Sequence, residues 1–312
     1  MLISPDRRFV VSHLGWVDKA SLWVYDVEKD RVNLVPAGNA KYLSLYPCRD
    51  EHQFLVFHHF DGKLIRLTIH TFANPAIPVC TVERSAETSQ FTGDVSALQT
   101  APRFFVAFYN PGQDGDDYLI SLDWTQSIIE TERFEWYNDA YDKDYQSIVG
   151  VIELASGELV VSIQRDSHPI VYDPRTKTVL RKLTLAGRLG NPKFRFAKQG
   201  RELWADDYDT ILKLDSVTLE RKKWRRLQGA LTGTAEFIGD WSFNEDESLC
   251  LVSRPFSGDV VAISTENLKT KYVAKTGRQP LQAVIVNNGD IIGRDWKTGD
   301  LLKGSLRQTW FG

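Results

Sequence analysis

Aromatic, histidine and arginine residues recur in short polar segments that separate paired apolar runs along the chain. Aromatic and arginine side chains presented together supply much of the affinity at protein interfaces, so these segments are candidates for binding a protein partner. The candidate residues are Trp16, His58, His59, Phe60, Arg165, His168, Tyr208, Arg254, Phe256, Arg294 and Trp296. The alternative is that the segments are ordinary hydrophilic turns that contain a few packing aromatics.

Two acidic stretches offer a different chemistry. Asp114, Asp116 and Asp117 lie close together, and a second acidic stretch covers residues 138–145. Clustered carboxylates are ligands that Ca²⁺ prefers, but residues 114–117 lack the ligand spacing and the terminal glutamate of an EF-hand loop. We therefore expect a solvated acidic patch that attracts a basic partner, with a metal site as the alternative.

A basic run of opposite sign covers residues 221–226, with Trp224 among its lysines and arginines. Basic residues around an aromatic side chain can follow a phosphate backbone. The same run is expected to form an outer strand, where exposed Lys and Arg protect a sheet edge from aggregation. We favour edge protection, so nucleic acid is not the expected partner.

A sevenfold repeat indicates the elements that position these residues. A polar turn precedes a short apolar strand seven times, and these strands begin at residues 9, 54, 104, 159, 203, 249 and 291. A second β-rich strand follows each of them. Four of these second strands end in aspartates, whose side chains can bond to the backbone of the next turn: Asp26, Asp123, Asp173 and Asp215. An all-β repeat of roughly 40 to 50 residues is typical of propeller blades.

Two segments carry a likeness to known proteins. Residues 5–12 contain a Pro-Asp turn followed by an apolar strand, and residues 22–27 read Leu-Trp-Val-Tyr-Asp-Val. These segments resemble the turn and the third strand of the WD40-like and YVTN-like β-propeller families. The regular Gly-His and Trp-Asp dipeptides of WD40 repeats are absent. We predict an all-β fold with one domain over residues 1–312, a seven-bladed β-propeller with four-stranded blades.

In a propeller, the four strands of a blade run from the centre to the rim as strands a to d. The loops that join strand b to strand c emerge on the same face as the connections between blades. The polar segments occupy b–c positions, so we expect the candidate residues to gather on one face. This predicts a non-catalytic module that binds another protein, such as a scaffold or an inhibitor of an enzyme or toxin.

No catalytic motif is present in the sequence. It contains no G-x-S-x-G, H-E-x-x-H, P-loop or G-x-G-x-x-G pattern. We therefore expect no cofactor and no enzyme activity. The alternative is a metal-dependent hydrolase or lyase with its site in the central channel, because channel sites are assembled from distant strands. A small-molecule ligand in the channel is also left open.

Composition argues against several other classes of protein. The formal net charge of -3 gives no overall attraction to nucleic acid or to an anionic membrane. No apolar run approaches the roughly 18 residues that span a membrane, and the N-terminal residues lack the regions of a signal peptide. Cys48, Cys80 and Cys250 are too far apart to indicate a zinc site or a disulfide framework. We expect a cytoplasmic protein.

Overall fold

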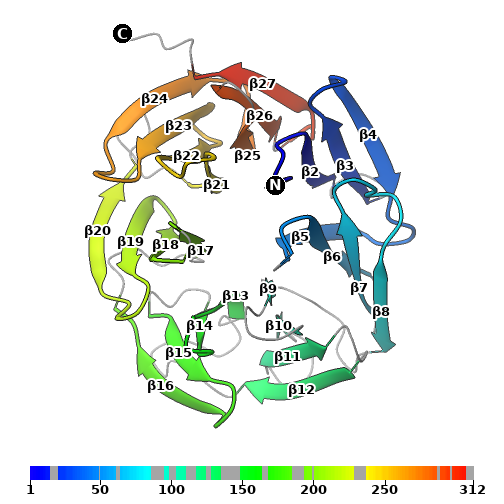
Figure 1. The fold of residues 1–312 in the computed structure, drawn as a ribbon, viewed down its shortest axis with the longest axis vertical. Coiled ribbons are helices and arrows are strands. Elements are labelled where there is room, and N and C mark those ends of the chain that lie inside the picture. Colours follow the sequence, from blue (N-terminus) through cyan, green and yellow to red (C-terminus); the bar gives the residue numbers. More distant parts are fainter. Residues whose placement is uncertain are drawn as a thin grey trace.

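The computed structural model is built from antiparallel strands arranged as a ring of sheets (Figure 1). It describes residues 1–14, 20–48, 50–60, 64–85, 95–97, 103–109, 117–123, 128–134, 148–163, 168–184, 193–198, 200–227, 237–286, 289–295 and 297–306. No helix within these ranges has the length and apolar character needed to cross a membrane.

Three four-stranded blades form the first half of the chain. The first blade contains β1 (Leu2–Ile3), β2 (Phe9–Leu14), β3 (Ser21–Asp26) and β4 (Arg31–Pro36). The second contains β5 (Tyr42–Pro47), β6 (Gln53–His59), β7 (Leu64–Thr71) and β8 (Cys80–Ser85). The third contains β9 (Val95–Ala97), β10 (Arg103–Tyr109), β11 (Asp117–Asp123) and β12 (Ile128–Phe134).

Three further four-stranded blades follow. The fourth contains β13 (Ile148–Glu153), β14 (Leu159–Ile163), β15 (Ile170–Asp173) and β16 (Thr178–Lys182). The fifth contains β17 (Phe194–Ala197), β18 (Glu202–Asp207), β19 (Thr210–Asp215) and β20 (Arg221–Arg226). The sixth contains β21 (Asp240–Phe243), β22 (Leu249–Arg254), β23 (Asp259–Ser264) and β24 (Thr270–Lys275).

The prediction of seven four-stranded blades is wrong, because the residues that the structure describes form six. The remaining strands, β25 (Pro280–Ile285), β26 (Asp290–Asp295) and β27 (Leu301–Ser305), form a three-stranded sheet, the terminal sheet. Within the described ranges nothing pairs with the outer edge of β27. Strand β1 does not complete this sheet, because Leu2 and Ile3 pair with Val11 and Val10 in the first blade.

Side-chain packing between the terminal sheet and the first blade closes the ring. Val284 of β25 packs in one core cluster with Val10 and Trp23. Arg7 donates a hydrogen bond from Nη1 to the carbonyl oxygen of Ile285 at 2.6 Å. Within the described residues, apolar contact and this hydrogen bond therefore join the terminal sheet to the first blade.

In the blades whose burial the structure describes, burial decreases from the middle strands towards the rim. Strands β3, β22 and β23 are almost wholly buried, whereas the outer strands β4 and β16 are mostly exposed. Middle strands pack against neighbouring sheets on both faces, so their sequences are continuous apolar runs. This explains why their positions were predictable: each predicted b strand starts within one residue of β2, β6, β10, β14, β18, β22 or β26.

The predicted role of the aspartates that end the c strands is confirmed in three blades. Asp26, Asp173 and Asp215 each accept a hydrogen bond through Oδ1 from the backbone N–H two residues later, at 3.1, 2.9 and 2.9 Å. Such bonds fix the turn that leads into the outer strand. The side chain of Asp123 lies outside the described part of the structure.

Candidate functional site

Tyr208 lies at the tip of the hairpin that joins β18 to β19, on the face where the b–c turns emerge. The pairing of Asp207 with Thr210 closes this two-residue turn. Tyr208 has a φ of 53°, a left-handed conformation that is uncommon for an aromatic residue. The side chain is 39% exposed. A large and partly apolar group is thus held at the surface by a short turn.

Phe256 occupies the corresponding turn of the sixth blade, between β22 and β23, and is 60% exposed. The backbone N–H of Gly258 donates to the carbonyl oxygen of Arg254 at 3.0 Å. Gly258 has a φ of 66°, and a Cβ at this position would meet the carbonyl oxygen of Arg278 at 3.0 Å. Glycine therefore suits this turn, because other residues would be strained and crowded.

A third aromatic ring connects these two turns. Phe237 lies in the connection between the fifth and sixth blades, and its ring centroid is 5.9 Å from that of Tyr208 and 6.2 Å from that of Phe256. These distances are within the range of favourable aromatic contacts. The aromatic patch is defined as Tyr208, Phe237 and Phe256. The sequence predicted two of these residues but not Phe237, which is outside the b–c turns.

Backbone hydrogen bonds hold the two residues that follow Phe237. The N–H of Ile238 donates to the carbonyl oxygen of Tyr208 at 2.8 Å, and the N–H of Gly239 donates to that of Ser253 at 3.0 Å. A Cβ on Gly239 would lie 2.5 Å from the carbonyl oxygen of Leu281, so only glycine fits without a shift of the backbone. The patch is therefore held in place by both neighbouring blades.

Charged groups support the turns beneath the patch. Arg254 donates from Nε and Nη2 to the two carboxylate oxygens of Asp259, each at 2.8 Å. Asp259 is fully buried and also accepts a hydrogen bond from Lys275 at 3.0 Å. In the fifth blade, Arg226 donates to Asp209 at 2.6 Å. Arg254 was predicted to contact a partner, and in the structure it is buried below Phe256.

One carboxyl group near the patch is buried without a partner. Asp207 is 1% exposed, and neither of its carboxylate oxygens makes a hydrogen bond within the described part of the chain. Burial, together with the nearby charges of Asp206 and Asp209, raises the pKa of Asp207 from 3.8 to about 7. This group therefore titrates near neutral pH, unlike an ordinary surface aspartate.

Three other predicted contact residues that the structure describes, His58, Phe60 and His168, do not join the patch. His58 is buried in β6, and its Nε2 lies 2.8 Å from Thr68 Oγ1. Phe60 follows β6 and lies under the guanidinium of Arg66. His168 is half-buried before β15. The sequence placed His58 in a loop, but β6 continues through residue 59 and turns this side chain into the blade interface.

Arg294, also a predicted contact residue, is buried in β26. The other predicted residues lie outside the described ranges or have side chains that do: Trp16, His59, Asp114, Asp116, Asp117, Arg165 and Trp296. Of these, His59 belongs to β6 and Asp117 to β11. Among the residues that the structure describes, no three His, Cys, Asp or Glu side chains converge in a way that could hold a metal ion.

The inner strands of the fifth and sixth blades share a buried ion pair. Arg195 of β17 donates from Nη2 to Asp240 Oδ1 of β21 at 2.6 Å. Burial would raise the pKa of Asp240, but Arg195 and other nearby cations hold it well below its usual range. Asp240 also accepts a hydrogen bond from the backbone N–H of Trp241 at 2.9 Å. This carboxylate is therefore ionised and occupied by protein groups.

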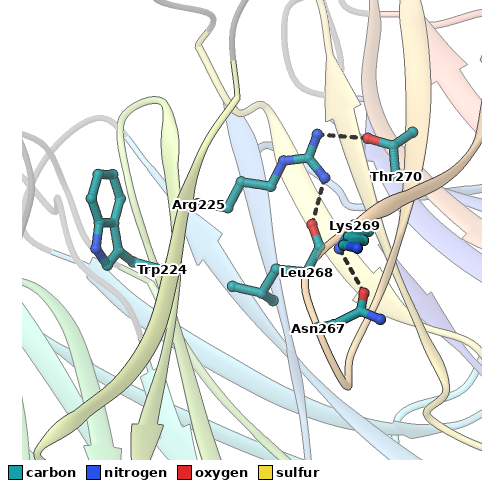
Figure 2. A pocket seen from close by; sticks show the side chains of 6 residues that line it. All are labelled: Trp224, Arg225, Asn267, Leu268, Lys269 and Thr270. Atoms are coloured by element: carbon teal, nitrogen blue, oxygen red, sulfur yellow. Dashed lines mark hydrogen bonds between the residues drawn. The ribbon is translucent and has the colours of Figure 1, made fainter.

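The basic run lies in β20, as predicted, and it joins two blades. Figure 2 shows Arg225 and Trp224 on opposite sides of this strand, beside a groove of about 350 Å³. Arg225 donates to the carbonyl oxygen of Leu268 at 2.5 Å and to Thr270 Oγ1 at 2.8 Å, both in the sixth blade. Lys223 donates to the carbonyl oxygen of Glu266 at 2.6 Å. These cations stabilise contacts between blades in addition to shielding an edge.

Comparisons with known proteins relate the chain to other molecules by its fold. No family model matches the sequence, and no curated protein matches it either. The structure is similar to the β-propeller domain of Cps50 (Swd1) from Myceliophteria thermophila, with a TM-score of 0.71 and 13% identity over 97% of this chain and 94% of that chain. It is also similar to a chain in the crystal structure of a Mitotic Checkpoint Complex, with a TM-score of 0.67 and 10% identity over 97% of this chain and 85% of that chain. The chain thus has a WD40-like β-propeller fold, and at these identities the likeness establishes the fold alone.

Proposed function

We propose that the protein is a non-catalytic interaction module that binds a protein partner through its aromatic patch. The observation that carries this proposal is the contact of two exposed aromatic side chains, Tyr208 and Phe256, with Phe237 between their turns. Large aromatic residues at interfaces supply a disproportionate share of binding energy. A surface turn does not need such a residue in order to fold, so their grouping favours a binding role.

The rigidity of the patch supports the same role. Backbone hydrogen bonds hold Ile238 and Gly239 next to Phe237, and the pair Arg254–Asp259 fixes the turn that carries Phe256. Little conformational entropy is then lost when a partner binds, because the contact residues are already ordered. A partner that presents an apolar group to this patch is the expected occupant.

A similar propeller has been observed within a protein assembly. One of the structures that resembles this chain is a Mitotic Checkpoint Complex. This precedent supports the proposal at the level of the fold and leaves the identity of the partner unassigned. That the binding face also includes the predicted contact residues outside the patch remains a prediction from the sequence.

Site-specific photocrosslinking in the native host tests the proposal. A photoreactive phenylalanine analogue replaces Phe256 in one version of the protein and Val217 in a control. Val217 is 80% exposed and lies in the turn between β19 and β20, at the opposite end of the blade from the b–c turns. The proposal predicts that one protein is crosslinked from position 256 and is absent from the control. Identical crosslinking patterns at the two positions would contradict it.

A further inference from the structure

A cavity of about 290 Å³ lies between the first and second blades. It is separate from the aromatic patch, which belongs to the fifth and sixth blades on the other side of the ring (Figure 1). We propose that this cavity binds a small uncharged ligand that carries hydroxyl groups and an apolar face, such as a monosaccharide. The inference does not depend on the proposed function.

The second blade turns a polar surface towards this cavity. Closer to the ring centre, Phe54 and Val56 of β6 pack with Leu22 of β3 in an apolar core. On the same face β7 contributes Thr68 and His70, because Thr68 pairs with Val56 and His70 pairs with Phe54. Polar groups between packed sheets cost free energy unless they are hydrogen-bonded, so the partners of Thr68 and His70 matter.

The surface that the second blade presents to the cavity is called the polar wall. His58, Thr68 and His70 form a hydrogen-bonded triad in it. Nε2 of His58 and Nε2 of His70 each lie 2.8 Å from Thr68 Oγ1. The hydroxyl has one hydrogen and can donate to only one ring, so at least one histidine must donate to it. Burial lowers the pKa of both histidines, to about 4 for His58. The triad is therefore uncharged and fixed in position at neutral pH.

The remaining charges on the polar wall cancel each other. Arg66 donates from Nε to Glu83 Oε1 in a close ion pair between β7 and β8. The guanidinium of Arg66 also lies over the ring of Phe60, 4.9 Å from its centroid. An anion would meet a guanidinium that is already neutralised, and a cation would meet a carboxylate that is already paired. The wall thus favours a ligand without net charge.

The chemistry of both walls matches a hydroxyl-bearing ligand. Thr81 and the pair Arg66–Glu83 place hydrogen-bond donors beside acceptors on the cavity surface, and a hydroxyl group can use both. The opposite wall is apolar and includes Leu22 and Val35. The volume of about 290 Å³ equals that of roughly ten water molecules. Covalently bonded atoms pack more closely than separate water molecules, so a single sugar ring is within this volume.

Titration calorimetry on the purified full chain tests this inference with four probes: glucose, myo-inositol, inorganic phosphate and Zn²⁺. Thr81→Val removes one hydroxyl from the cavity and keeps the shape of the side chain. Thr178→Val in β16 is the matched control, because Thr178 is an exposed threonine on the outer strand of another blade. Melting curves of both variants establish that they are folded.

The expected result is saturable binding of glucose or myo-inositol to the native chain. The affinity should fall about tenfold in Thr81→Val, as loss of one hydrogen bond predicts, and should be unchanged in Thr178→Val. Glu83→Gln leaves Arg66 without its carboxylate, and this variant is expected to gain affinity for phosphate. The inference is overturned if neither neutral probe binds up to its solubility limit. It is equally overturned if both threonine variants bind them alike, or if the native chain binds only phosphate or only Zn²⁺.

Discussion

Arg254 and Asp259 lie at the two ends of the turn that carries Phe256, and they form a buried ion pair with two parallel hydrogen bonds of 2.8 Å. Asp259→Ala would leave the guanidinium of Arg254 buried without its counter-ion. Breaking a buried pair from one side costs about 3–5 kcal/mol of unfolding free energy, because the remaining charge is not solvated. Urea denaturation measures this loss.

The exposed pair Arg278–Asp300 provides the control for that measurement. Asp300→Ala is expected to cost no more than about 1 kcal/mol, because water already solvates both groups. Equal losses in the two variants would show that the pair Arg254–Asp259 does not hold the turn.

The raised pKa of Asp207 predicts that the free energy of unfolding depends on pH between 3.8 and about 7. Its pKa is raised from 3.8 to about 7 in the folded protein, so folding favours the protonated carboxyl. The stabilisation is complete below 3.8 and is lost as the pH rises through about 7. Asp207→Asn stays neutral at every pH. Its unfolding free energy should therefore exceed that of the native chain by an amount that grows as the pH rises from 3.8 to about 7 and levels off at higher pH.

The relevant quantity is the difference between the two proteins, because groups that do not interact with Asp207 titrate equally in both. Chemical denaturation across this pH range measures the difference. A difference that is independent of pH would mean that Asp207 is ionised or hydrated in the folded protein.

Arg225 is expected to stabilise the contact between the fifth and sixth blades. Arg225→Ala removes its hydrogen bonds to Leu268 and Thr270, and the expected loss is about 1–3 kcal/mol. Arg221→Ala is the control, because Arg221 is an exposed residue of the same strand and its guanidinium lies 6.0 Å from the ring of Trp224. This substitution should change the free energy of unfolding by less than about 0.5 kcal/mol. Thermal unfolding compares the two, and similar losses would refute a specific role for Arg225.

Strand positions could be predicted from the sequence because burial and turn chemistry are local. Middle strands are packed on both faces, so their residues form apolar runs, and Asp26 and Asp215 mark the turns that follow them. The way in which the ring closes depends on contacts between distant residues. The packing of Val284 against Val10 closes the ring, and no local pattern indicates such a contact.

The candidate site was predictable only in part, for the same reason. Tyr208 and Phe256 lie in b–c turns, where position in the repeat indicates the face. Phe237 lies in a connection between blades, and its role depends on two rings that belong to different blades. The burial of His58 depends on two further pairings between β6 and β7, His58 with Arg66 and His59 with Ile65, which extend the strand beyond its apolar run.

The most direct test of the proposed function is the affinity of the crosslinked partner for patch variants. Calorimetry compares the native chain with Tyr208→Ala, Phe256→Ala and the control Val217→Ala. Loss of an interface hot spot costs about 2 kcal/mol or more, so each patch variant should weaken binding by roughly 30-fold or more, with melting temperatures close to native. The control should bind as the native chain does. Unchanged affinity in both patch variants would contradict the assignment of this surface as the binding site.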